Sequence, residues 1–190
     1  MPTAKLDAIN TIISTVGSGP VSSLTAPQNA EIVVAQQILD EITKELQIEG
    51  WHFNTEEGVE FSPSGGTITL DENILRVSVP LVDRGSVDVV ARGRSLYDRK
   101  NKSSTFDSPV TLDVVRNLDW DSLPDAFQRL CYIKAARVFA GRLLKDIENI
   151  RYSLLDEEKA RTDFEESDSI TGRPNIFDSY SEQSKLDRYL

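Results

Sequence analysis

The fold class is decided by one run in the second half of the chain, which reads Phe106-Asp-Ser-Pro-Val-Thr-Leu-Asp-Val-Val-Arg-Asn-Leu-Asp-Trp-Asp-Ser-Leu-Pro-Asp-Ala-Phe-Gln-Arg-Leu-Cys-Tyr-Ile-Lys-Ala-Ala-Arg-Val-Phe139. Residues Val110 to Val114 alternate between apolar and polar, which is typical of a strand with one buried face. Asp121 and Ser122 are then candidates for a helix cap, and the apolar residues beyond them recur at helical spacing. The run therefore predicts a strand, a turn and a helix in succession, and it contains no catalytic motif.

The remaining sequence places helices at both ends of the chain and strands in the middle. Apolar residues recur at helical spacing up to Gly17, and again from a capping box at Thr25-Ala-Pro-Gln28 to Gly50. Residues 51–118 alternate in short runs separated by Gly, Pro, Asp and Asn, a pattern that predicts an antiparallel sheet. A fourth helix is expected over about residues 146–167, because the helical pattern resumes there after a break.

These patterns predict an α+β fold in which a helical bundle is built from the N- and C-terminal segments, with an inserted antiparallel β-sheet domain. We expect residues 1–50 and 119–167 to form the helical body and residues 51–118 to form the β insert. Residues 168–190 have low hydrophobicity and a Gly-Arg-Pro break, so we expect a C-terminal arm that is loose alone and orders on assembly. The candidate residues for docking this arm on a partner are Phe177, Tyr180 and Tyr189.

Charge is unevenly distributed along the 190 residues, which carry a formal net charge of -10. Residues 1–83 hold three basic residues against twelve acidic ones, residues 84–145 hold twelve against seven, and residues 146–190 hold six against twelve. A protein that binds nucleic acid on its own is usually basic over a whole face, and this acidic chain with a basic middle does not fit that class. Two oppositely charged surfaces on one body fit a subunit that meets copies of itself.

Several functional classes lack the residues that they need. Cys131 is the only cysteine and His52 the only histidine, which excludes an intrachain disulfide and a Cys/His zinc cluster. We accordingly expect no catalytic residue, no metal and no cofactor. No apolar run approaches the roughly 20 residues that a membrane helix needs, and the first residues are too polar for a signal peptide. The protein is therefore expected to be made in the cytoplasm and to have no membrane partner.

The acidic pair Glu56-Glu57 is the remaining candidate for chemistry. Paired carboxylates can perform acid-base catalysis or bind a hard cation. Adjacent residues of an extended segment point to opposite faces, however, which argues against a shared site. A solvated turn is the favoured interpretation, and a small acidic hydrolase that depends on these carboxylates stays open as an alternative.

Basic residues in the middle of the chain are the candidate contact residues. Most of them lie in one segment that contains few acids, and two more fall on the third expected helix, on the side opposite its apolar stripe. A solvated surface is the simplest interpretation, whereas contact with an acidic neighbouring subunit or with passing DNA phosphates is the functional one. The candidate intersubunit or lumen contacts are Arg92, Arg94, Arg99, Lys100, Lys102, Lys134 and Arg137.

The order and spacing of several short motifs resemble the tail tubular protein A family, the head-to-tail adaptors of short-tailed phages. The resemblance covers roughly residues 5–165. The matching motifs are Ile12-Ile-Ser-Thr-Val-Gly17, Gly19-Pro-Val-Ser-Ser-Leu24, Ala35 with Ile38-Leu39, Gly50-Trp-His-Phe-Asn54, Glu56-Glu-Gly58, Leu96-Tyr-Asp-Arg99, Phe106-Asp-Ser108, Asp119-Trp-Asp-Ser-Leu-Pro-Asp-Ala-Phe127 and Ala135-Ala-Arg-Val-Phe139.

The resemblance implies a non-enzymatic structural protein of the virion, located in its tail or neck. It implies a dodecameric ring of identical subunits below the portal protein of the capsid, with a nozzle of the tail tubular protein B type on the other side. Tail fibres would dock at the periphery of the ring, and double-stranded DNA would pass through its centre during ejection. A monomeric binding module used in host takeover is the other alternative that the residues leave open.

Overall fold

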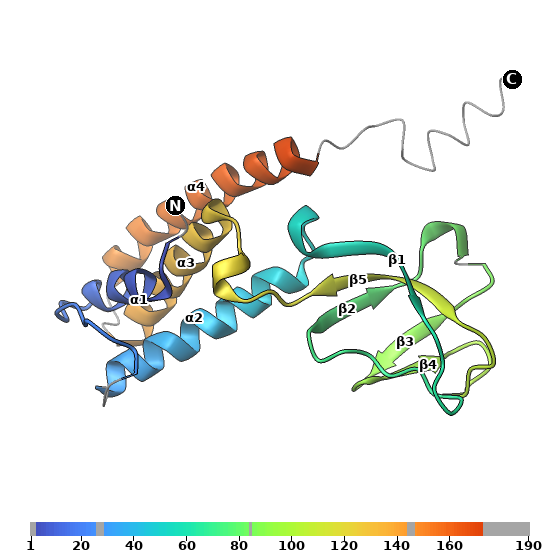
Figure 1. Ribbon diagram of the computed structural model, residues 1–190. Helices are drawn as coiled ribbons and strands as arrows, with labels where there is room; N and C mark the ends of the chain where they lie inside the picture. Colours follow the sequence, from blue (N-terminus) through green and yellow to red (C-terminus); the bar gives the residue numbers. More distant parts are fainter. Residues whose placement is uncertain (1–2, 26–28, 84, 144–146, 173–190) are drawn as a thin grey trace, which may run out of the picture. The chain divides into compact units, whose positions relative to one another are not determined.

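The α+β class is confirmed by the computed structural model of the protein (Figure 1). The chain divides into two compact units. The first, here called the helical unit, is formed by the described residues of 1–49 and 118–168, and the second, the β unit, by those of 50–117 together with the end of the last helix. The structure describes residues 3–25, 29–83, 85–143 and 147–172.

Four helices build the helical unit, and the third of them, α3, packs against both α1 and α2. The Phe127 ring on α3 meets the Phe164 ring on α4 edge to face, with 5.1 Å between ring centroids. Both rings are fully buried, so this contact stabilises the packing of α4 on α3. The helices are α1 (Lys5–Ser14), α2 (Ala30–Ile48), α3 (Asp125–Leu143) and α4 (Ile147–Gly172).

The ends of α1 and α2 are set by two glycines, as the sequence predicts. Gly17 and Gly50 have φ angles of +82° and +83°, in the left-handed region that favours glycine. The Ser18 N–H donates to Ile13 O and the Gly17 N–H to Ser14 O, which is the Schellman pattern of a helix C-terminus.

The predicted starts of α2 and α3 are wrong by a few residues. Helix α2 begins at Ala30, and the Thr25 hydroxyl, expected to cap it, lies instead 2.9 Å from the Ser23 hydroxyl. Asp121 and Ser122, the expected caps of α3, belong to a separate 3-10 turn, Trp120–Ser122, and α3 begins only at Asp125. Near Thr25 the local bond is between hydroxyl side chains, which compete with a helix start, whereas before α3 the Ser122 and Leu123 N–H groups donate to the backbone oxygens of Asp119 and Trp120 and close a separate turn.

Five strands build the β unit, and β5 is the central strand of its larger sheet (Figure 1). Strands β1 and β2 flank β5 and are both antiparallel to it, while β3 and β4 form a separate hairpin. The predicted antiparallel sheet is thus confirmed. The strands are β1 (Thr55–Phe61), β2 (Ile74–Ser78), β3 (Val89–Arg92), β4 (Ser95–Asp98) and β5 (Val110–Arg116).

The core of the β unit is formed by the inward side chains of β5 and of the segments that cover them. Val110, Leu112 and Val114 are buried at every second position, as the alternation predicts. They cluster with Leu96 of β4 and with Ile68, which lies outside any strand. The Leu96 N–H donates to Ile68 O over 3.0 Å and the Leu70 N–H donates to Arg94 O over 2.7 Å, so two backbone hydrogen bonds hold this segment beside β4 and the turn before it.

Candidate interaction surfaces

Five of the predicted contact residues lie on or just beyond the β3–β4 hairpin. Arg92 ends β3, Arg94 lies in the two-residue turn, and Arg99, Lys100 and Lys102 follow β4. Gly93 occupies the first turn position with a φ angle of +63°, which the favoured hairpin turns require there. All five cationic side chains are exposed, but they lie at two ends of the hairpin, with Arg92 and Arg94 at its turn and the other three just beyond the end of β4.

The partners of these cations differ. Arg94 forms an ion pair with Glu72, and Arg99 lies 3.7 Å from the Asp88 carboxylate. The Arg92 guanidinium lies 3.4 Å from the centre of the Tyr97 ring, a cation–π contact that holds the charge over an aromatic face. The Lys100 ammonium reaches only a backbone oxygen, that of Ser86, over 3.4 Å. Arg92 and Lys100 thus have no carboxylate partner among the described residues.

The turn after β4 is organised by Asp98. Its carboxylate accepts the Asn101 backbone N–H over 2.9 Å and the Asn101 side-chain amide over 2.7 Å. The backbone hydrogen bond is the main reason why the pKa of Asp98 lies below its usual value. Lys102, in the same turn, has a φ angle of +53°, so the geometry presents its side chain at a tight bend.

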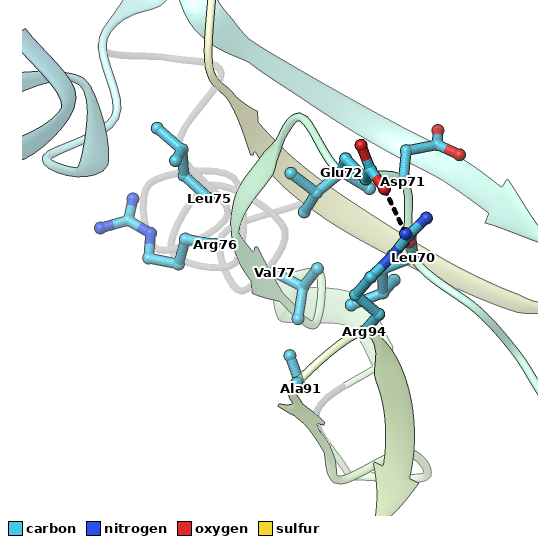
Figure 2. Close-up of a pocket in the computed structure, with 10 residues that line it drawn as sticks. Leu70, Asp71, Glu72, Leu75, Arg76, Val77, Ala91 and Arg94 are labelled. Atoms are coloured by element: carbon cyan, nitrogen blue, oxygen red, sulfur yellow. Dashed lines mark hydrogen bonds and ion pairs between the residues drawn. The ribbon is translucent and has the colours of Figure 1, made fainter. Parts of the chain in front are cut away.

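A surface pocket of about 380 Å³ lies between β2, β3 and the segment before β2. Figure 2 shows Val77 and Ala91 directed toward each other across it, with the Arg94–Glu72 ion pair beside them. Arg76 extends away from that pair (Figure 2). The lining is mixed, because apolar side chains such as Val77 and Ala91 share it with the charged Asp71, Glu72, Arg76 and Arg94.

The two candidate residues on α3 already have partners within the helical unit. The Lys134 ammonium lies 3.2 Å from Glu45 of α2, and Arg137 pairs with Glu157 of α4. Both cationic side chains are largely buried by the helices around them. Their ion pairs hold α2 and α4 to α3, which leaves little of either charge for another molecule. Phe177, Tyr180 and Tyr189 lie outside the described residues.

One carboxylate of the Glu56-Glu57 pair in β1 is engaged by a cation. Glu56 forms an ion pair with Arg116 of β5 over 2.8 Å, and a bulge after Glu56 shifts the register of the strand. A carboxylate held in this way is less available for the shared site that a hydrolase would use. In the part of the chain that the structure describes, no three His, Cys, Asp or Glu side chains form a group that could hold a metal ion.

Two surface features were not singled out from the sequence. On the hairpin, Val90 pairs with Tyr97 on the face opposite the buried Leu96. On α4, Leu154 and Leu155 are 42% and 61% exposed. For the hairpin face, the available sequence signal was the spacing of two residues that separates Val90 from Arg92 and Tyr97 from Arg99. For the α4 face, burial of Ala160 and Phe164 shows which side of the helix faces the core, and Leu155 lies on the other side.

None of the described helices combines the length and apolar character needed to cross a bilayer. The protein's class follows from comparison with known sequences. A family model described as "Tail tubular protein" matches residues 6–174, and the chain therefore belongs to the tail tubular protein family, structural proteins of the bacteriophage tail.

A named relative agrees with this assignment. Tail tubular protein A of Klebsiella phage KP34 is 31% identical to this chain over 151 residues, which are 78% of each protein. The family resemblance drawn from the short sequence motifs is thereby confirmed. The virion tail is accordingly the place of this protein.

Proposed function

We propose that this protein is the head-to-tail adaptor of a short-tailed phage. Twelve copies form a ring that joins the portal protein of the capsid to a nozzle of the tail tubular protein B type. Tail fibres attach at the periphery of the ring, and the double-stranded genome leaves through its centre. The observation that carries the proposal is the match to the tail tubular protein family over residues 6–174, together with the relative named tail tubular protein A.

The distribution of charge supports assembly into a ring. A ring needs heterologous interfaces, in which one patch of a subunit meets a different patch of the next. In the helical unit, four acids on α2 or at its C-terminal cap form ion pairs with cations of the same unit. The pairs are Asp40 with Lys5, Glu41 with Arg142, Glu45 with Lys134 and Glu49 with Arg161. The exposed cations of the hairpin are therefore better placed to contact another molecule.

The acidic character of the chain supports passage of DNA without retention. Tight binding of many phosphates would slow a genome that must slide through the ring. The net charge of -10 opposes such binding, and Arg94 and Arg99 have carboxylates beside them. Neither ring assembly nor passage of DNA requires catalysis. The protein is synthesised in the host cytoplasm and then incorporated into the neck of the virion.

The mass of the assembled protein is the direct test. Purified protein is measured by sedimentation and by native mass spectrometry, alone and after mixing with the portal protein of the same phage. The expected result is a twelve-subunit species in at least one of the two conditions, bound to the portal in the second. A chain that stays monomeric in both conditions is not an adaptor, and a monomeric binding module would then describe it better.

A further inference from the structure

We propose that the β3–β4 hairpin of one subunit docks on the exposed face of α4 of the neighbouring subunit. The hairpin face is defined by Val90, Arg92, Tyr97 and Arg99. The α4 face is defined by Leu154, Leu155, Glu158 and Glu166. This inference rests on the proposed ring and names the two surfaces that join its subunits.

The hairpin face combines an apolar centre with two cations. Val90 and Tyr97 are directly opposite each other in the register, and Val90 is 38% exposed. Arg92 and Arg99 follow at the next outward positions of each strand, since side chains alternate between faces. Because the Arg92 guanidinium already lies over the Tyr97 ring, the cation is held in place before any partner arrives. Arginine and tyrosine are the residues that most often anchor protein interfaces.

The α4 face has the complementary composition. Ala160 and Phe164 point into the helical unit and are 1% exposed. Leu155, Glu158 and Glu166, at helical spacing, fall on the opposite side of α4. Neither Glu158 nor Glu166 has an ion-pair partner among the described residues, and both are exposed. Two exposed leucines and two carboxylates therefore give this side of α4 an apolar part and an acidic part, with the exposed Lys159 next to Glu158.

The hairpin face and the α4 face are complementary in apolar character and in charge, which points to one occupant, a second copy of this chain. Leu155 can cover Val90 and the Tyr97 ring while the Glu158 carboxylate, one helical turn away, approaches one of the two guanidinium groups, and Glu166 adds negative charge about two turns further along α4. Apolar burial supplies affinity, and the charges fix orientation and suppress wrong pairings. Four other acids, on α2 or at its C-terminal cap, already have ion-pair partners in their own unit and are less available to the hairpin. Each subunit then donates a hairpin and accepts one, which is the head-to-tail contact that closes a ring.

A charge-swap experiment tests the contact. The hairpin variant carries Arg92→Glu and Arg99→Glu, and the helix variant carries Glu158→Arg and Glu166→Arg. Arg94 is left unchanged because its ion pair with Glu72 is much closer than the 3.7 Å contact between Arg99 and Asp88. The control carries Lys44→Glu and Arg142→Glu, two exposed cations of the helical unit, and changes the net charge as much as the hairpin variant does. All are measured by native mass spectrometry, with and without the portal protein.

We expect each variant alone to need a subunit concentration about tenfold higher, or more, to form rings. The control should assemble at the same concentration as the unmodified protein. An equimolar mixture of the two variants should regain rings with alternating subunits, because each new charge meets its opposite on the neighbour. A chain with all four substitutions should regain rings on its own.

Four other results overturn the inference. Normal assembly of the hairpin variant removes the hairpin from the interface, and if that variant also loses affinity for duplex DNA, the hairpin faces the channel. Rescue by the four-substitution chain but not by the mixture means that the surfaces meet within one chain. Failure of both rescues means that they do not meet at all. Unmodified protein that forms no ring in either condition refutes the proposed function as well.

Disulfide trapping provides a second measurement that does not depend on charge. A chain with Tyr97→Cys and Leu155→Cys should oxidise to a ladder of covalent oligomers, and a mixture of the two single variants should stop at dimers. The control pairs Leu155→Cys with Lys44→Cys and should give no ladder. The native Cys131 is buried and does not contribute. A double variant that remains monomeric on a denaturing gel, or one that matches the control, contradicts the contact.

Discussion

The Gln47 side chain holds the backbone of Leu118 through both of its amide atoms. The Leu118 N–H donates to Gln47 Oε1 over 2.7 Å, and Gln47 Nε2 donates to Leu118 O over 3.2 Å. Gln47 is fully buried near the end of α2, and Leu118 is where the chain re-enters the helical unit. One side chain thus joins two parts of that unit that are 71 residues apart in sequence.

Replacing Gln47 by leucine should destabilise the helical unit, although the two side chains have similar volumes. Gln47→Leu removes both hydrogen bonds and leaves backbone groups of Leu118 without these partners, at a cost of about 1–3 kcal/mol in the free energy of unfolding. Urea unfolding followed by circular dichroism measures the change. Gln37→Leu, at an exposed position of the same helix, is the matched control and should stay within about 0.5 kcal/mol of the unmodified protein. Equal effects of the two substitutions would contradict this role.

Gly50 is required by both its conformation and its surroundings. A Cβ atom at this position would lie 3.0 Å from Val115 Cγ2 and within 2.5 Å of the Arg76 guanidinium, at a φ angle of +83°. Gly50→Ala should therefore cost about 1–2 kcal/mol for the backbone conformation and further energy for the contact with Val115. Gly58→Ala is the control, because Gly58 has a φ angle of +67° and open space around it. A thermal shift no larger for Gly50→Ala than for Gly58→Ala would mean that the contact is relieved without cost.

Sequence reasoning recovered the elements whose signals are periodic. The alternation of Val110, Leu112 and Val114 gave β5, and glycines gave the ends of α1 and α2. The start of α2 was misplaced because a Thr that could cap a helix can equally bond to a neighbouring hydroxyl, and that of α3 because a separate turn closed by backbone hydrogen bonds precedes it. The Gln47 contact could not be predicted, since nothing in a helical pattern tells which buried polar residue meets a distant backbone.

For the candidate contact surface, the sequence predicted only which cations to consider and not which of them remain unpaired. Arg92, Arg94 and Arg99 were identified by composition, and the structure places the first two at the turn of the hairpin and Arg99 just beyond its other end. Lys134 was grouped with them by spacing alone, but it pairs with Glu45 across α2 and α3, because α3 is covered on more than one side. Which cations keep a free charge depends on tertiary neighbours that one sequence does not display.

The Phe127–Phe164 contact should control how firmly α4 is held. Phe164→Ala removes a fully buried ring, and such truncations cost about 3–5 kcal/mol. Because α4 loses its main anchor on α3, limited proteolysis should cut within α4 faster than in the unmodified protein. Ile170→Ala on the same helix, where the side chain is 68% exposed, is the control. If both variants resist protease equally, the packing of α4 does not depend on this ring.

Cys131 should be chemically silent in the folded protein. Burial raises the pKa of its thiol to about 12, with the Thr43 hydroxyl opposing the shift in part. The thiolate, which is the reactive form, is then nearly absent at pH 8. A soluble aromatic disulfide reagent should label no thiol in native protein and one thiol in protein unfolded by urea. Rapid labelling without denaturant would show that this part of the core opens readily.

The same raised pKa makes the stability of the helical unit depend on alkaline pH. Between the ordinary thiol pKa, about 8.5, and the folded value of about 12, the unfolded chain releases a proton that the folded protein keeps. The unfolded state therefore binds fewer protons, and the free energy of unfolding falls by about 1 kcal/mol per pH unit as the pH rises through this window. Urea titrations at pH 8, 9 and 10 measure the slope for the unmodified protein and for Cys131→Ala, which lacks the titrating group. Lysines and tyrosines contribute equally to the slopes of both proteins, so the difference between the two slopes comes from Cys131. Equal slopes would mean that the thiol ionises as easily in the folded protein as in the unfolded chain.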